Sequence, residues 1–405
     1  MRTHLIRVLA TSLALLFVVG VAHADRRTSL HGNQLIKDRD DTFNYPQLAL
    51  SYNRSLSIDY GTAAGFGNAL FIAGPDKNSA IGIALHRGDS VTPIGGGFYD
   101  GSVEPGMIFG SVAELEFPSQ DNITAPTIAD LIYAMRIGQN KLGFRLGFIG
   151  QGDTHSLNED HQNTTSAFGF RLGAGYSMGK DGDFAFDASY LTGSRTAGEK
   201  EDDVEDASAL TIHLGGRYYF AKSKGFKIGA LVNTYFQQTG GTTFGTPDVE
   251  NSTTRIAAML GFGPVYRSKE KKYTVAMHAH LGFLNQSVEP NSKQDDDETS
   301  ETRVFFPGFN VAMEYHLLSW LVFRSGASYN YLINASDSAN KKEDSGNGDF
   351  NGERGGFSWN AGFGFLMENF RIDGTLSEGF MTSGPQFIGG NAPGLFGLVS
   401  ATATF

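Results

Sequence analysis

Segments in which apolar and polar residues alternate run through most of the chain. In residues 166–180, Phe168, Phe170 and Leu172 share one side, while Arg171 and Gly173 share the other. A period of two residues is that of a β-strand with two different faces. The segments run to about ten residues or more, the length of a tilted strand that crosses a membrane, whereas strands of soluble sheets average about five or six.

Short and long connections alternate between these segments. The short ones lie near residues 76–78, 139–140, 180–182, 222–225, 270–271, 319–320 and 369, and the long ones span 86–127, 152–164, 193–207, 240–252, 287–302, 335–354 and 381–394. Short turns and long loops in strict alternation indicate an all-β, transmembrane, antiparallel up-and-down β-barrel with short periplasmic turns and long extracellular loops. The seven short turns give fourteen strands, and residues 55–60 and 395–405 add two, which predicts about sixteen. Fourteen is the alternative if residues 48–61 are an irregular entry segment.

The chain ends in one more alternating segment, residues 394–405, with Phe405 as its last residue. One face carries Leu395, Val399 and Phe405, and the other carries hydroxyl groups. This segment resembles the closing strand of a bacterial outer-membrane β-barrel. The resemblance implies that the barrel-assembly machinery, which reads a terminal Phe, is a partner.

The N-terminus has the pattern of an export signal. Arg2 and Arg7 precede an apolar run at 8–21, and Ala22-His23-Ala24 fits an A-x-A cleavage site. We therefore predict a signal peptide at 1–24, an N-terminal periplasmic or plug segment at 25–47, and the barrel at 48–405. The predicted location is the cell outer membrane.

Composition narrows the functional classes. The chain has no Cys, which excludes disulfides and thiol chemistry. Its formal net charge of −11 argues against a nucleic-acid partner. Counts of 52 Gly and 32 Phe suit a wall with small residues inside and rings outside. Acidic runs at 199–206 and 295–301 are interpreted as solvated loops, with divalent cations bridging to lipopolysaccharide as the alternative.

The predicted inner face carries charged and imidazole side chains, because such groups cannot face lipid cheaply. The predicted pore-lining residues are Arg136, Arg145, Arg171, Asp187, His213, Arg217, His278, His280, Glu314, Arg324 and Arg371. The long connection 88–127 has no Lys or Arg and is predicted to fold into the lumen as a constriction, or else to form a surface lobe. Its acidic residues Asp100, Glu104, Glu114 and Glu116 are the candidates there.

These features predict a porin-like channel for passive diffusion of small solutes or ions, without cofactor or metal. Two alternatives stay open: a plugged barrel that transports hydrophobic molecules, and a structural or adhesive surface barrel. Catalysis is not expected, because the lumen histidines have no Ser or Asp partner fixed by spacing. The oligomeric state is left open, although general porins, which the chain resembles in architecture, are often trimers.

A weaker resemblance is to the long-chain fatty acid transporter family, which is similar in length. Its members carry an N-terminal plug and an Asn-Pro-Ala-x-Leu-type motif near the start. The nearest match is Asn44-Tyr45-Pro46-Gln47-Leu48-Ala49, with a Tyr inserted and Gln in place of Ala. The resemblance implies a plug for hydrophobic transport but carries over no binding residue.

Overall fold

The fold is known from a computed structural model. It describes residues 26–60, 68–87, 114–115, 123–124, 127–158, 161–196, 204–243, 246–290, 298–339, 349–353, 357–376 and 396–405. The predicted signal peptide lies outside these residues.

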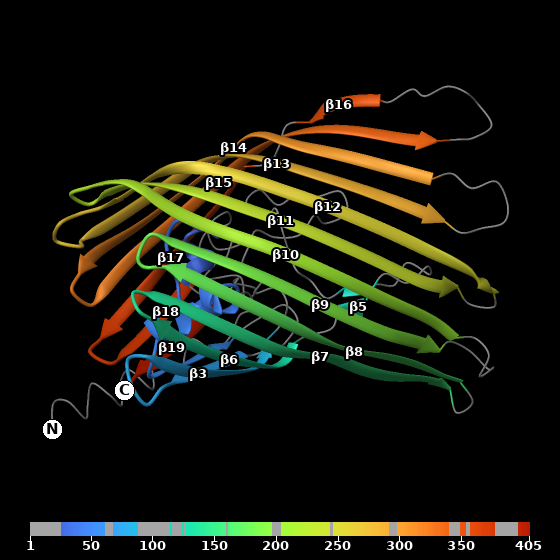
Figure 1. The fold of residues 1–405 in the computed structure, drawn as a ribbon, viewed down its shortest axis with the longest axis horizontal. Coiled ribbons are helices and arrows are strands. Elements are labelled where there is room, and N and C mark those ends of the chain that lie inside the picture. Colours follow the sequence, from blue (N-terminus) through green and yellow to red (C-terminus); the bar gives the residue numbers. More distant parts are fainter. Residues whose placement is uncertain are drawn as a thin grey trace, which may run out of the picture.

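The wall is one closed antiparallel sheet (Figure 1). Its first strands are β1 (Ser55–Tyr60), β2 (Asn68–Ala73), β3 (Ser79–Arg87), β6 (Thr127–Ile137), β7 (Asn140–Asn158), β8 (His161–Met178), β9 (Gly182–Thr196) and β10 (Val204–Ser223). It continues with β11 (Phe226–Thr243), β12 (Thr246–Arg267), β13 (Tyr273–Pro290), β14 (Glu298–Leu318), β15 (Leu321–Ala339), β16 (Asp349–Glu353), β17 (Phe357–Met367), β18 (Phe370–Leu376) and β19 (Phe396–Thr404). β16 and β17 pair with different parts of β15 and share one place in the wall. The wall therefore has sixteen strand positions, as predicted.

Each wall strand pairs with its neighbours in the sequence, and β19 closes the ring on β1. The register of that closure matches Ser55 with Thr404 and Tyr60 with Val399. The short turns and the C-terminus lie at the same end of the barrel (Figure 1). In barrels of this kind the short turns are periplasmic, so this is the periplasmic end.

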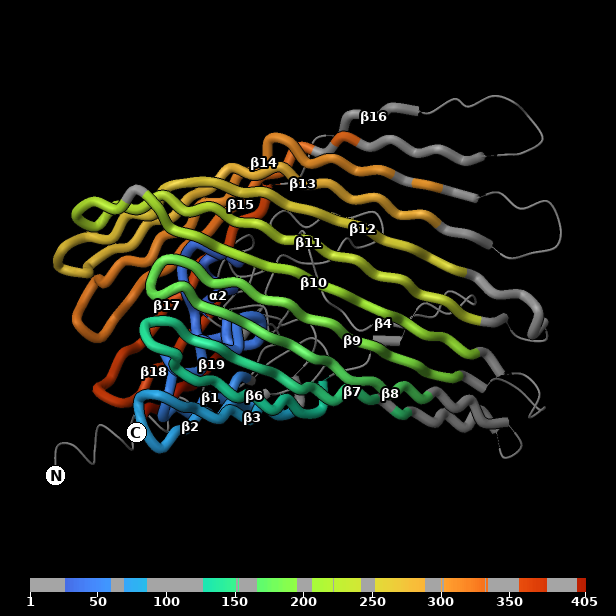
Figure 2. The backbone as a smooth tube through the Cα atoms, viewed as in Figure 1, coloured from blue at the N-terminus to red at the C-terminus, as the bar shows by residue number. Residues whose placement is uncertain are grey.

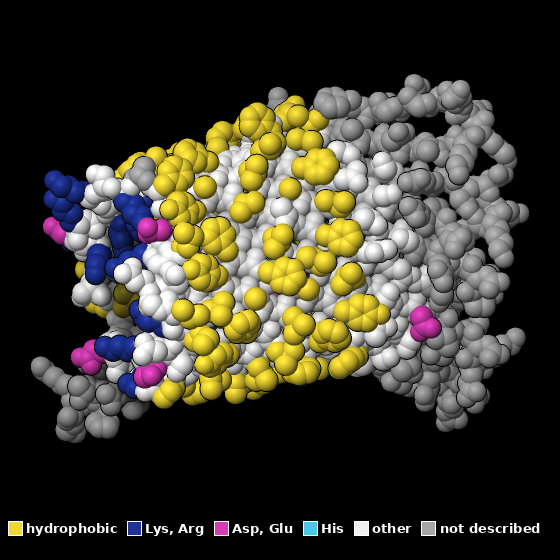
Figure 3. All heavy atoms as spheres, viewed as in Figure 1, with side chains coloured by type: hydrophobic (Ala, Val, Ile, Leu, Met, Phe, Trp, Pro, Cys, Tyr) yellow, Lys and Arg dark blue, Asp and Glu magenta, His cyan; other side chains and the backbone are white. Residues whose placement is uncertain are grey.

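The outer face of the wall is apolar. Large side chains on alternate residues, including Phe168, Phe170, Leu260 and Phe309, are exposed there. On the face that Figure 3 shows, apolar side chains form a band across the middle of the molecule, and charged groups gather at the turn end. This closed wall with its lipid-facing band is that of a bacterial outer-membrane β-barrel, located in the outer membrane.

Residues 26–54, named here the interior segment, run inside the wall at the periplasmic end (Figure 2). They contain the short helix α2 (Arg26–Ser29) and the 3₁₀ helices η1 (Asp40–Phe43) and η2 (Pro46–Ser51). Among the described residues, no helix is long and apolar enough to cross a membrane. Two further short strands, β4 (Glu114–Leu115) and β5 (Ile123–Thr124), pair with each other, and β4 lies against β9 and β10.

Candidate functional site

The interior segment packs against the wall through apolar side chains on several sides. Toward β2, β3 and β6, Phe43 and Ala49 join a buried cluster with Leu70, Ile72 and Ile132. Here the wall departs from the usual polar interior, because aliphatic side chains of β2 and β6 point inward. Burying such apolar surface stabilises the docked segment.

The opposite side of the segment makes a second apolar contact. Leu30, Leu35 and Ile36 pack with Tyr219 and Val265 on β10 and β12. The Tyr219 hydroxyl also donates a hydrogen bond of 2.8 Å to the carbonyl of Leu35. The interior segment is thus held from two opposing parts of the wall.

Glycines on the inner face make room for this segment. A Cβ atom on Gly143 would collide with the backbone of Gln47 and Pro46, and one on Gly326 would collide with the backbone of Leu30. Only the absence of a side chain allows the two backbones to approach so closely. The inward glycines that the sequence pattern shows therefore leave the space that the backbone of the interior segment occupies.

A buried ionic network joins the segment to β9 and β10. Arg217 places its Nη1 2.7 Å from Asp41 of the segment and its Nε 2.8 Å from Asp183 of β9. Lys37 adds a second cation to Asp183 at 2.7 Å, and Arg27 adds one to Asp41 at 2.5 Å. Charges buried in this way persist only when paired, so the wall charges and the segment charges depend on each other.

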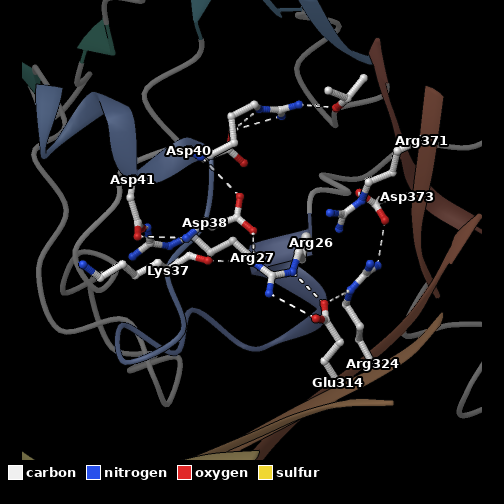
Figure 4. A network of polar contacts seen from close by, with 12 residues as sticks. Arg26, Arg27, Lys37, Asp38, Asp40, Asp41, Glu314, Arg324, Arg371 and Asp373 are labelled. Atoms are coloured by element: carbon white, nitrogen blue, oxygen red, sulfur yellow. Dashed lines mark hydrogen bonds and ion pairs between the residues drawn. The ribbon is translucent and has the colours of Figure 1, made fainter. Parts of the chain in front are cut away.

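A second network joins the segment to β14, β15 and β18 (Figure 4). Arg26 lies 2.6 Å from Glu314 and 2.7 Å from Asp38. Glu314 also meets Arg324 at 2.8 Å, and Arg324 meets Asp373 at 2.7 Å. The chain of alternating charges ties α2 to the strands β14, β15 and β18 of the wall.

The ionisation of Asp38 follows from this network. Burial would raise the pKa of its carboxyl group, but the guanidinium groups of Arg26 and Arg371 outweigh burial and hold the pKa well below its usual value. A carboxyl group whose pKa is lower in the folded state stabilises that state above its unfolded pKa of about 4. This contribution is lost as the pH falls from about 4 through the folded-state pKa.

A third cluster lies on the wall itself. Arg145 of β7 meets Asp187 of β9 at 2.6 Å, and Arg171 of β8 meets the same carboxylate at 3.2 Å. Arg145 also donates a hydrogen bond to the carbonyl of Phe43. Asp130 of β6, 3.6 Å from Arg145, is the second carboxylate, so the cluster balances two cations with two anions and adds one more contact to the interior segment.

Farther from the turns, the described inner wall carries few charged side chains. Apolar side chains there form two buried clusters, which contain Ile149, Ala167, Leu191, Ala207, Ala209, Ala257, Met259 and Leu284. Among the inward side chains described in this half, Arg255 and Arg303 carry charge. The charged groups of the inner wall are thus concentrated beside the interior segment.

The lumen histidines lie between these two zones. His278 and His280 have ring centroids 5.4 Å apart, and His280 is hydrogen-bonded to Asn330 at 2.7 Å. Within the described ranges, no group of three or more His, Asp or Glu side chains could hold a metal ion.

The structure places the predicted pore-lining residues as follows. Nine are buried: Arg145, Arg171, Asp187, His213, Arg217, His278, His280, Glu314 and Arg324. Arg371 is half-buried, and Arg136 is exposed beside the β6–β7 turn. Of the constriction candidates, Asp100, Glu104, Glu116 and the side chain of Glu114 lie outside the described residues.

Sequence reasoning missed the partners of these wall residues. Asp183 was not singled out, and the charges at Lys37, Asp38 and Asp41 gave no indication of the wall groups they meet. The one available signal was the dense run of both charge signs at 37–41. A run of that kind is more often a solvated leader.

One side of the interior segment borders a cavity. A cavity of about 570 Å³ lies between the segment and the wall at β17, β18, β19 and β1. From the segment it is lined by Arg26, Arg39 and Tyr52, and from β19 by Thr402 and Thr404. Turn residues, Ser319 and Asn369 among them, also line it, so it lies at the periplasmic end.

A scan against protein-family models and a search of curated proteins give no match. Solved structures are similar at low identity. The alcaligin outer membrane receptor FauA from Bordetella pertussis matches at 10% identity over 73% of this chain and 48% of the receptor, with a TM-score of 0.39. This chain therefore spans about half of that receptor.

Two shorter proteins match over most of their length. The toluene transporter TodX from Pseudomonas putida has 10% identity over 89% of this chain and 92% of TodX, with a TM-score of 0.33. The monoaromatic hydrocarbon channel CymD has 10% identity over 96% of this chain and 98% of CymD, with a TM-score of 0.37. All three TM-scores are below 0.5, so these likenesses carry no argument about the site.

Proposed function

We propose that the protein is a plugged outer-membrane channel that admits small, largely apolar, uncharged molecules to the periplasm. The observation that carries the proposal is the interior segment, whose charges are tied to the inner wall through Asp41–Arg217 and Arg26–Glu314. A sixteen-strand barrel is wide enough for an aqueous channel unless something fills it. The segment occupies the periplasmic end of that space, as a plug would.

The chemistry of the inner wall supports an uncharged solute. The inward side chains of the extracellular half are largely aliphatic or thioether, as at Leu191, Met259 and Leu284, which are buried. Apart from Arg255 and Arg303, the charged groups of the described inner wall lie deeper and are paired with one another and with the plug. A cation entering from outside would therefore lose water without gaining a counter-charge, whereas an apolar molecule would gain contacts.

The cavity beside the plug gives this solute a way out. The plug is packed against β2, β3 and β6 and against β10 and β12, but beside β18, β19 and β1 it leaves about 570 Å³. We assign the exit to this side. The proposal gives no catalytic role to His278 or His280.

The test is uptake of 1-N-phenylnaphthylamine, an uncharged aromatic dye that brightens when it enters lipid. A Gram-negative host with an intact outer membrane excludes most of this dye. Cells that carry the folded protein are expected to take it up several-fold faster than cells with an empty vector. Equal rates, with folded protein shown by heat-modifiable migration in electrophoresis, would refute the proposed function.

The exit side is tested by filling the cavity. In the double variant Thr402→Trp/Thr404→Trp, two indole rings enter the cavity lined by these residues, so dye uptake is expected to fall several-fold. The matched control is Ala401→Trp/Ala403→Trp on the same strand. These two residues alternate with Thr402 and Thr404 and therefore point to lipid, where Trp side chains are tolerated. An equal loss in both variants, or in neither, would place the exit elsewhere.

A second candidate function is an open porin for small solutes or ions, the first interpretation drawn from the sequence. The same cavity favours it, because its lining includes charged groups such as Arg39 and Asp40. Steady potassium chloride conductance of the intact protein in planar bilayers would select this alternative. Absence of conductance from the intact protein would favour the plugged channel.

A further inference from the structure

Three neighbouring turns at the periplasmic end carry a concentration of positive charge. They are the β8–β9, β10–β11 and β12–β13 turns, which follow one another around the rim because β8 to β13 pair in order. Their exposed cations are Lys180, Lys222, Lys224, Arg267, Lys269, Lys271 and Lys272. We call these seven side chains the basic rim.

Two carboxylates lie among the basic rim. Asp181 is ion-paired with Lys222, and Glu270 lies 3.1 Å from Lys272. Seven cations less two anions leave a net charge of +5 on three turns of a chain whose net charge is −11. The excess is therefore local and opposite in sign to the rest of the protein.

The turns on the other side of the barrel differ. The β14–β15 turn is Ser319-Trp320, without charge, and the β17–β18 turn carries Glu368. The β2–β3 turn carries Asp76 and Lys77, which cancel. The basic rim thus covers one side of the periplasmic end, and Lys and Arg side chains gather there beside the apolar band (Figure 3).

Aromatic side chains fix the depth of the basic rim. Tyr266 and Tyr273 flank the β12–β13 turn with ring centroids 5.7 Å apart, and Phe220 lies 5.7 Å from Phe262 beside the β10–β11 turn. Such rings mark the boundary between hydrocarbon and headgroups. Lys271 lies two residues before Tyr273 in a tight turn, so it is at most roughly 7 Å farther out. The headgroup layer is about 5–7 Å thick. The ammonium groups therefore lie among the lipid headgroups.

We propose that the basic rim binds anionic phospholipid headgroups of the periplasmic leaflet. Ammonium and guanidinium groups form charge-assisted hydrogen bonds with phosphate oxygens, and a net negative headgroup adds long-range attraction. The depth of the rim selects lipid over a soluble partner, because flexible Lys side chains at this level meet phosphates before they reach bulk water. The bound lipids form a patch under β8 to β13, with Arg136 exposed beside the neighbouring β6–β7 turn.

The experiment measures which lipids the full mature protein retains. The protein is equilibrated in detergent with equal amounts of phosphatidylglycerol and phosphatidylcholine, and retained lipids are counted by native mass spectrometry. The unmodified protein is expected to retain at least about five times as much phosphatidylglycerol as phosphatidylcholine. One basic side chain near an anionic surface contributes about 1 kcal/mol, which corresponds to about fivefold. The five-site variant K222Q/K224Q/K269Q/K271Q/K272Q is expected to lose the preference.

Two matched variants separate charge from side-chain identity and position. The variant K222R/K224R/K269R/K271R/K272R keeps the charges and is expected to keep the preference. Lys77→Gln removes a cation from another turn and is expected to leave the preference for phosphatidylglycerol unchanged. No preference in the parent, or a preference that survives in the five-site Gln variant, would overturn the proposal. Rim-dependent binding of poly-glutamate without lipid preference would overturn it in favour of an acidic protein partner.

Discussion

Deleting residues 26–51 is expected to convert a closed barrel into a conducting one. The wall begins at Ser55, so the deletion leaves every wall strand in place. It removes the backbone that fills the periplasmic end, and the charged inner wall at Arg217 and Glu314 becomes hydrated. In planar bilayers, steady conductance is expected to rise by on the order of tenfold or more over the intact chain.

A single substitution that displaces the interior segment is also expected to make the barrel conduct. Gly143→Leu places a side chain where Gln47 and Pro46 pass, so the plug is expected to be displaced and conductance to appear. Gly152→Leu on the same strand is the control, because a Cβ there meets nothing within 4 Å. A deleted barrel that stays silent, although folded, would show that something other than the interior segment closes the lumen.

Arg217→Met is expected to be the most damaging single loss in the ionic networks. The side chain of Arg217 is 1% exposed, and its partners Asp41 and Asp183 are 2% and 0% exposed. Without Arg217, Asp41 and Asp183 each keep one cation, Arg27 and Lys37, but each loses a charge-assisted hydrogen bond. Such a bond is worth about 1.5–3 kcal/mol, so the two together cost about 3–6 kcal/mol. The free energy of unfolding in urea is expected to fall by that amount, and trypsin is expected to gain access to Lys37.

The comparison for this variant is Lys222→Met, which breaks the exposed pair with Asp181. Both side chains of that pair are about two-fifths exposed, at 38% and 41%. Water screens such a pair, so the expected cost is below about 1 kcal/mol. Equal costs for Arg217→Met and Lys222→Met would show that burial does not set the strength of the network.

The sequence was sufficient to predict the wall. Alternation in β8 and β13 identifies the lipid face residue by residue, because one face of each strand must meet hydrocarbon. The sequence predicted residues 25–47 as a periplasmic or plug segment, but the contacts of the interior segment could not be predicted in the same way. Its contacts join residues far apart in the chain, 176 positions for Arg217 with Asp41 and 288 for Arg26 with Glu314. No local period connects such pairs, so the sequence shows the charges but not which ones meet.

The seam between β1 and β19 has a consequence for biogenesis. The plug directly precedes β1, and it contacts the last strands through Ser29 with Thr375 and Arg39 with Thr402, pairs that are 346 and 363 residues apart. These contacts form only once the C-terminal strands have been synthesised, and loop closure over such separations is slow. The pairing of β19 with β1 and the enclosure of the interior segment are therefore expected to occur together, late in folding. If the interior segment lies outside the lumen when β19 pairs with β1, the barrel closes with an empty lumen.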